Sequence, residues 1–198
     1  MKKAIIIHSW ITKRKFYDPA RPTPSNADWL PWLSKQLIIR GIHTVAPEMP
    51  RVYYPEYDIW KKELERFELD EDTTLIGHSC GAGFLVRYLS ENPVKVGKVI
   101  LVAPWLGIIP DDLREYAPSE ILEPTFFEFK IDRNLATRTA GLTLIESTND
   151  KPYIQKSVEI LKESLNDLRV LTLKDKGHFW AKDLGGVEFP ELLAEVLR

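Results

Sequence analysis

The sequence predicts an α/β protein in which a mostly parallel sheet of about six strands lies between two layers of helices. Short apolar runs rich in β-branched residues recur along the chain, with amphipathic stretches between them. The runs are continuously hydrophobic rather than alternating, which indicates strands that are covered on both faces. A length of 198 residues suits one domain, so we expect a single domain over residues 1–198.

Six segments of the sequence have the composition of buried strands. They are Lys3–His8, Ile42–Pro47, Thr73–Gly77, Lys98–Ala103, Leu142–Ser147 and Arg169–Leu173. Between them, apolar residues recur at the three- and four-residue spacing of amphipathic helices. The helices are expected at residues 28–41, 57–69, 81–92, 152–165 and 188–198. Pro190 suits the first turn of the last helix, where a missing N–H costs nothing.

Two long segments interrupt this alternation of strands and helices. Ser9–Ala27 is rich in proline and is expected to be a loop after the first strand. Trp105–Thr139 separates the fourth and fifth strands and mixes turn residues with apolar ones. Because long segments inside a small domain are usually functional or irregularly helical, we do not expect residues 105–139 to be an empty loop.

The composition argues against several classes of function. Lys and Arg (27) nearly balance Asp and Glu (29) without a basic stripe, so no nucleic-acid partner is expected. The apolar run Ala4–Ile7 is too short for a secretion signal, and no stretch is long enough to span a membrane. A single cysteine forms no internal disulfide, so the expected location is cytoplasmic. The four histidines lack metal-binding spacing, and neither a metal nor a cofactor is expected.

The stretch LIGHSCGAG, residues 75–83, brings together three reactive side chains: His78, Ser79 and Cys80. It fits the pattern G-x-S-x-G of a nucleophile elbow, in which a strand reverses sharply into a helix and small flanking residues let the chain segments touch. The pattern follows a predicted strand and precedes a predicted helix, as the elbow requires. The residue at the tip is Ser79, which makes it the predicted nucleophile, whereas His78 points to the side of the turn.

Two backbone N–H groups are expected to form an oxyanion hole beside Ser79. Cys80 begins a helix, where unpaired N–H groups and the helix dipole favour a developing negative charge. We expect its thiol to be a small buried apolar group. The loop after the first strand usually supplies the second donor, for which Trp10 is the first choice and Ser9 the second.

A serine hydroxyl attacks only with the help of a base and an acid that orients the base. In elbow-type sheets both follow later strands, in the order Ser, Asp or Glu, His. His178 is the only histidine downstream of Ser79 and follows the sixth strand. Asp150 follows the fifth strand and is the predicted acid. Asp175 and Asp183 are alternatives, but they lie on the loop of His178 itself and are poorly placed to brace it from across the site.

The segments LIGHSCGAGFLVRYL, ESTNDKPY and DKGHF resemble the small serine hydrolases of the retinoblastoma-binding-protein-9 family, which includes bacterial YdeN-like proteins. The resemblance implies an α/β-hydrolase fold with strand order 2-1-3-4-5-6 and a Ser79, Asp150, His178 triad that hydrolyses esters or amides. Two departures stand out. His8-Ser9 occurs where many hydrolases have His-Gly. The segment 105–139 is longer than in compact members, so the resemblance leads us to expect a small cap insertion at residues 105–139.

The leading hypothesis is therefore a metal-independent, carboxylesterase-like serine hydrolase that acts on a small ester, amide or thioester through an acyl-enzyme. The candidate substrate pocket comprises Ser9, Trp105, Phe126, Phe127, Phe179 and Trp180, together with Trp10. A second hypothesis is a hydrolase-like module that binds a protein partner with little turnover. A third makes Cys80 a redox or nucleophilic thiol.

Overall fold

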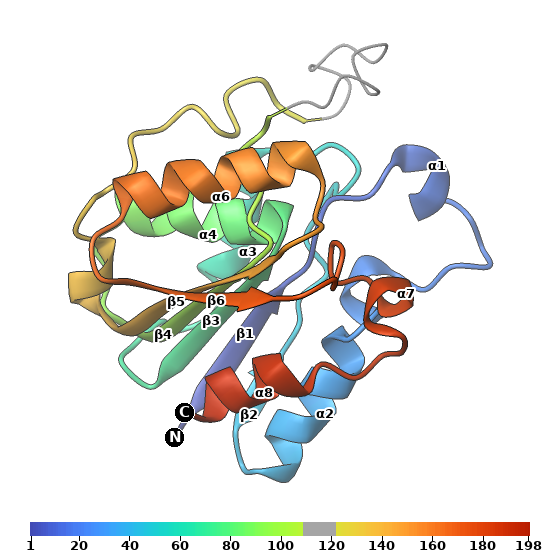
Figure 1. Ribbon diagram of the computed structural model, residues 1–198, viewed down its shortest axis with the longest axis horizontal. Helices are drawn as coiled ribbons and strands as arrows, with labels where there is room; N and C mark the ends of the chain where they lie inside the picture. The colour runs from blue at the N-terminus through green and yellow to red at the C-terminus, as the bar shows by residue number, and fades with distance from the viewer. Residues whose placement is uncertain (109–121) are drawn as a thin grey trace.

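The computed structural model describes residues 1–108 and 122–198, and its centre is a six-stranded sheet (Figure 1). The strands are β1 (Lys3–Ile7), β2 (His43–Val45), β3 (Thr73–His78), β4 (Val96–Val102), β5 (Thr139–Ser147) and β6 (Leu168–Leu173). All neighbours pair in parallel, in the order β2-β1-β3-β4-β5-β6. The predicted sheet and its strand order are confirmed.

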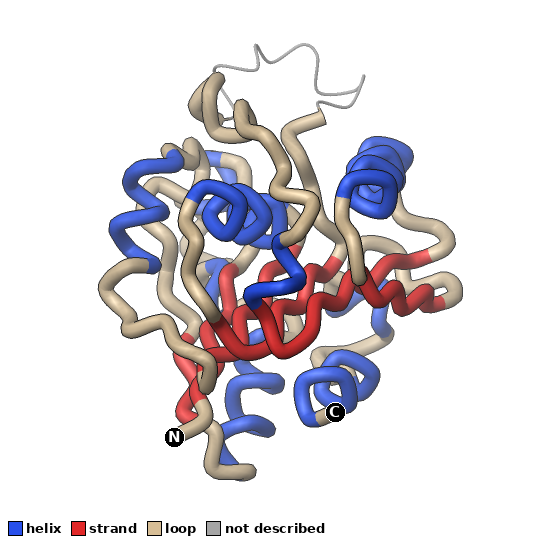
Figure 2. Tube along the Cα trace, turned by 90° about the vertical axis from the view of Figure 1, so that its left-hand side faces the viewer, coloured by secondary structure: helices blue, strands red, loops and turns tan. Residues whose placement is uncertain are grey.

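Helices cover both faces of the sheet and give three layers. One face carries α3 (Tyr57–Leu64), α4 (Cys80–Glu91) and α6 (Pro152–Ser164), and the other carries α2 (Leu30–Ile39) and α8 (Pro190–Leu197), as Figures 1 and 2 show. The central strands β1, β3 and β4 are buried almost throughout, whereas β6 at the edge is largely accessible. Continuous hydrophobicity thus marks the strands that lie between two helical layers.

The segment predicted as one long loop after β1 contains two short helices. They are α1 (Lys13–Phe16) and η1 (Pro24–Asn26), and two more short helices, α7 (Ala181–Leu184) and η3 (Leu135–Arg138), were also not predicted. Each spans about one turn, which is too short to show a helical repeat of apolar residues. The helix expected at 57–69 ends at Leu64, after which three-residue turn hydrogen bonds replace the α-helical ones.

The segment 105–139 was expected to form a cap, and its residues 109–121 lie outside the described residues. On either side of them, Trp105, Leu122 and Phe126 are buried in the hydrophobic core. None of the described helices is long and apolar enough to cross a lipid bilayer.

The parallel arrangement brings all carboxyl ends of the strands to one edge of the sheet. The strand order reverses between β1 and β3, because the chain passes from β1 to β2 on one side and returns to β3 on the other. In open α/β sheets, ligands bind in the crevice at such a reversal. The loop that begins at Ser9 and the turn at Ser79 border this crevice.

Candidate active site

Ser79 lies at the tip of a sharp turn between β3 and α4. Its backbone angles, φ 54° and ψ −113°, are unusual for a residue with a side chain and mark a strained conformation. The glycines on either side allow the turn to form. A Cβ atom at Gly81 would lie 2.5 Å from the carbonyl oxygens of Ile7 and His8. The predicted elbow therefore exists, and its glycines are needed because backbone segments touch there.

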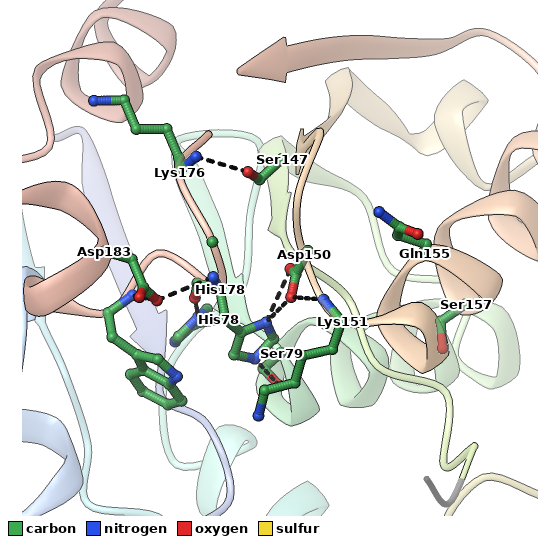
Figure 3. Close-up of polar contacts among 12 residues, drawn as sticks. His78, Ser79, Ser147, Asp150, Lys151, Gln155, Ser157, Lys176, His178 and Asp183 are labelled. Atoms are coloured by element: carbon green, nitrogen blue, oxygen red, sulfur yellow. Dashed lines mark hydrogen bonds and ion pairs between the residues drawn. The ribbon is translucent and has the colours of Figure 1, made fainter. Parts of the chain in front are cut away.

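Ser79, His178 and Asp150 form a continuous chain of hydrogen bonds (Figure 3). Ser79 Oγ lies 3.0 Å from His178 Nε2, and His178 Nδ1 lies 3.0 Å from each carboxylate oxygen of Asp150. A carboxylate only accepts hydrogen bonds, so Nδ1 carries the proton and Nε2 is free to accept the proton of Ser79. All three residues are nearly buried, with 5%, 5% and 7% exposure for Ser79, His178 and Asp150.

The loop after β5 is tied to the loop after β6, which sets Asp150 against the ring of His178. Ser147 Oγ accepts the backbone N–H of Lys176 at 2.9 Å (Figure 3), and Asn149 Oδ1 accepts that of Gly177 at 2.7 Å. The polar residues of the segment ESTND thus act on the neighbouring loop as well as carrying the aspartate. Their role was not predicted, although the segment was among those that carried the family resemblance.

Asp183 supports the backbone of His178 rather than its ring. One carboxylate oxygen accepts the backbone N–H groups of His178 at 3.1 Å and Trp180 at 3.3 Å (Figure 3). The other alternative acid, Asp175, lies 3.4 Å from the hydroxyl of Thr148 and has no contact with the imidazole. Of the three candidate acids, Asp150 is the one that meets the imidazole.

His78 is wholly buried beside the hydrogen-bond chain of Ser79, His178 and Asp150, and it supports the backbone of His178. Its Nε2 donates to the backbone carbonyl of His178 at 3.0 Å, and its ring packs against Trp29 and Trp180. Burial, and to a smaller extent the nearby His178, lower the pKa of His78 to about 3. His78 is therefore neutral at neutral pH, and it holds the main chain of His178 rather than contacting Ser79.

The two expected oxyanion donors, the backbone N–H groups of Cys80 and Trp10, lie close to each other. Cys80 is the first residue of α4, so its backbone N–H has no acceptor within the helix. Burial raises the pKa of the Cys80 thiol, and the nearby backbone N–H of Trp10 offsets part of that rise. His8 anchors the loop of Trp10, because its Nδ1 donates to the carbonyl of Ser9 at 2.9 Å and its Nε2 accepts the N–H of Met49 at 2.8 Å.

A cavity of about 540 Å³ opens in front of Ser79. Of the residues predicted to line it, Ser9, Trp10, Trp105 and Trp180 do so. Tyr153 also lines it and was not predicted.

The three phenylalanines predicted for the pocket do not line the cavity. Phe126 packs in the core against Trp60, and Phe127 packs behind it, against Phe126 and Trp105. Phe179 stacks on Phe189 with the ring centroids 5.2 Å apart. These rings pack in or against the core instead, because aromatic side chains near an active site fill the core as readily as the cavity. Within the described part of the chain, no three His, Cys, Asp or Glu side chains cluster as metal ligands.

The serine hydrolase family profile matches residues 22–196 of this chain. The chain belongs to the serine hydrolase family. This serine hydrolase is 29% identical to serine hydrolase RBBP9 of Rattus norvegicus over 170 residues, which cover 85% of this chain and 84% of the rat protein. It is 28% identical to YdeN of Bacillus subtilis over 104 residues, which cover 50% of this chain and 55% of YdeN. The sequence match to YdeN thus spans little more than half of that relative.

Solved structures confirm the fold of this serine hydrolase. The crystal structure of YdeN from B. subtilis superimposes with a TM-score of 0.78 at 24% identity, over 100% of this chain and 97% of YdeN. Est1E from Butyrivibrio proteoclasticus, solved with ferulic acid bound, superimposes with a TM-score of 0.69 at 12% identity, over 100% of this chain and 88% of Est1E. The α/β-hydrolase fold implied by the family resemblance is therefore correct.

Proposed function

We propose that this serine hydrolase cleaves carboxylic esters, or the related amides or thioesters, of small substrates through a Ser79, His178, Asp150 triad. The observation that carries the proposal is the unbroken hydrogen-bond chain from Ser79 Oγ through His178 to Asp150, with Ser79 on a strained turn that faces the cavity. This geometry suits the activation of a hydroxyl group by a histidine that a carboxylate holds in one tautomer.

In the proposed reaction, His178 Nε2 takes the proton of Ser79 as Oγ attacks the substrate carbonyl carbon. The backbone N–H groups of Cys80 and Trp10 stabilise the negative charge on the carbonyl oxygen. The protonated imidazole then gives its proton to the leaving alcohol or amine, and an acyl-enzyme forms on Ser79. Water, activated by the same histidine, releases the acid and restores Ser79. Asp150 keeps the imidazole oriented throughout and stabilises its positive charge.

The buried thiol of Cys80 does not serve as the nucleophile in this proposal. Burial raises its pKa, so the thiol stays protonated at neutral pH, and only a thiolate attacks efficiently. The residue contributes its backbone N–H instead.

Labelling with a fluorophosphonate and turnover of 4-nitrophenyl butyrate test the proposal. We expect both in the wild-type protein and a loss of about 10³-fold or more in kcat for Ser79→Ala. Ser164→Ala, at the end of α6 and away from the cavity, is the matched control and should behave as wild type. Equal labelling and turnover in Ser79→Ala would contradict the proposal. A folded wild-type protein that neither labels nor cleaves would instead favour the protein-binding module.

A further inference from the structure

Cationic side chains border the mouth of the cavity in front of Ser79. Lys15 belongs to α1, Arg21 to the loop after it, Lys151 follows Asp150, and Lys182 belongs to α7. They come from three separate parts of the chain, so the fold and not a local run of sequence brings them to one opening. The whole chain has a formal net charge of −2, and the positive charge at the cavity is therefore a local property.

These cations are close enough to affect one another. Burial lowers the pKa of Lys15, and the positive charges of Arg21, Lys151 and Lys182 lower it further, together with that of Arg14. Like charges gathered in this way destabilise the folded state unless a ligand of opposite charge compensates for them. An arrangement that costs stability and lies at the entrance of a reactive cavity points to a function in binding.

Few carboxylates compensate for this charge. Asp28 is the one described acidic residue that lines the cavity outside the triad, and its Oδ1 already accepts the N–H of Ala181 at 2.8 Å. Arg21 has Asp18 3.3 Å away. Within residues 1–108 and 122–198, Lys15, Lys151 and Lys182 take part in no ion pair. The described lining of the cavity thus carries an excess of positive charge.

The cavity next to Ser79 is aromatic rather than charged. Trp10 and Trp105 lie side by side, with ring centroids 6.3 Å apart, and Trp180 lies 5.3 Å from the ring of His178.

Lys151 lies between the aromatic interior of the cavity and its cationic mouth. It follows the triad acid Asp150, and its ammonium lies 5.6 Å from the centre of the Tyr153 ring. In Figure 3 the Lys151 side chain extends from its own backbone, next to Asp150, toward the side of Ser79. A ligand that fills the cavity would meet indole rings near the reacting atoms and ammonium groups toward solvent.

We propose that the substrates of this hydrolase are anionic: an ester or amide with an apolar body that packs on Trp10, Trp105 and Trp180, and an oxyanion, a carboxylate or a phosphate, that pairs with Lys15, Lys151 and Lys182. This inference rests on the proposed function for the bond that is cleaved. It adds the chemical class of the substrate, because the lysines would distinguish anionic from neutral substrates at a position away from the carbonyl group that is cleaved.

Matched pairs of chromogenic esters test the inference. The 4-nitrophenyl monoester of suberic acid and its methyl-capped form share the acyl chain and leaving group and differ only in the terminal charge. A second pair carries a terminal phosphate and its dimethyl ester, and it separates phosphate from carboxylate recognition. For wild type, we expect kcat/KM to be about tenfold higher for the charged member at low salt. The ratio should fall toward one at about 0.5 M sodium chloride, because salt screens exposed charges.

Charge-removing variants assign the preference to the proposed residues. Lys15→Gln, Lys151→Gln and Lys182→Gln should each lower the charged-to-neutral ratio by about two- to fivefold, as expected for exposed ion pairs. Lys62→Gln, on α3 and away from the cavity, is the control and should keep the wild-type ratio. Because the readout is a ratio on one protein, a general loss of stability or activity does not imitate the effect.

Binding to Ser79→Ala protein gives the same comparison without turnover. The affinities of the uncleaved esters can be followed through tryptophan fluorescence, since three indoles line the cavity. Tighter binding of the charged member supports the inference even if wild type cleaves none of the esters, a result that would overturn only the proposed function. Serine-dependent cleavage of both members at equal rates overturns the inference and leaves the proposed function standing. A preference that survives in the triple Lys→Gln variant also overturns it.

Discussion

The floor and the mouth of the cavity are built in opposite ways. At the floor, Ser79, Asp150 and His178 are nearly buried, and each follows directly from the carboxyl end of a strand or from the loop just after it. At the mouth, Lys15, Lys151 and Lys182 are exposed, and two of them belong to helices of about one turn. The sheet and a network of hydrogen bonds set the positions of the residues at the floor. The mouth depends on loops, which can change without disturbing the sheet.

We therefore expect the floor to determine the reaction and the mouth to determine which substrates are preferred. Changes at the floor should affect bond cleavage or folding strongly, whereas changes at the mouth should have small effects on stability and act mainly on selectivity.

The largest effect is expected for the acid that contacts the imidazole. Asp150→Asn should lower kcat by about 10² to 10⁴-fold, because the amide favours the wrong tautomer of His178. Asp183→Asn removes a charge from the backbone side of the same histidine and should lower kcat less than about tenfold, since its amide oxygen still accepts the N–H of His178. Steady-state hydrolysis of 4-nitrophenyl butyrate measures both variants. Equal losses in the two would show that the ring of His178 does not depend on Asp150.

The second effect concerns Gly81, two residues after the nucleophile, which lies against the backbone at the end of β1. Gly81→Ala should lower the free energy of unfolding by about 3 kcal/mol, because its Cβ would overlap the carbonyl oxygens at the end of β1 and force α4 away. The gain in helix propensity of about 1 kcal/mol does not compensate for this. Gly186→Ala, where a Cβ meets no atom within 4 Å, is the control. Urea unfolding measures both, and an unchanged stability for Gly81→Ala would show that the elbow tolerates a shift of α4.

The third effect is a pH dependence of stability that originates in His78. Its pKa in the folded protein is about 3, below the ordinary value of about 6.5, so between these values the unfolded chain binds a proton that the folded chain does not. Stability is therefore expected to fall as the pH decreases through this window. The contribution of His78 from pH 7 to pH 5 is about 2 kcal/mol.

His78→Gln removes this titration and should weaken the dependence of urea unfolding on pH between 5 and 7. His43→Gln changes an exposed histidine on the edge strand β2 and should leave the dependence as in wild type. Identical pH slopes for wild type and His78→Gln would mean that His78 is not kept neutral in the folded state.

The smallest effect is expected at the mouth. Lys15→Gln removes one of several cations that repel each other, so it should raise the free energy of unfolding at low salt by about 0.3 kcal/mol, a value limited by solvent screening. High salt should abolish the gain. Thermal unfolding at two salt concentrations measures the difference. A loss of stability in Lys15→Gln would show that the cations at the mouth do not repel one another appreciably.

The sequence predicts the sheet well because its signal is local. Each central strand is a short, continuously apolar run that ends at a turn, and the strands so identified agree with β1 to β6 within a few residues. The order of the strands followed from the family resemblance and is confirmed. Short helices such as α1 and α7 carry no periodic signal and were missed for that reason.

Residue identities were easier to predict than side-chain surroundings. Ser79, Asp150 and His178 were identified because each follows its own strand, and parallel strands bring their carboxyl ends to one edge. The same reasoning did not distinguish Trp105, which lines the cavity, from Phe126 and Phe179, which lie in the core. All are aromatic residues in the segments that follow β4 and β6, and only packing decides which ring faces the cavity.

The class of fold and the three polar residues that can act as a nucleophile, a base and an acid could be predicted from the amino-acid sequence, because they depend on local composition and on position after a strand. The folded structure was needed to show which aspartate contacts the imidazole, which aromatic rings border the cavity and that cations from three distant segments share its mouth. Those features depend on which residues, far apart in the chain, lie next to one another in the folded protein. They arise only when the sheet and its loops are assembled.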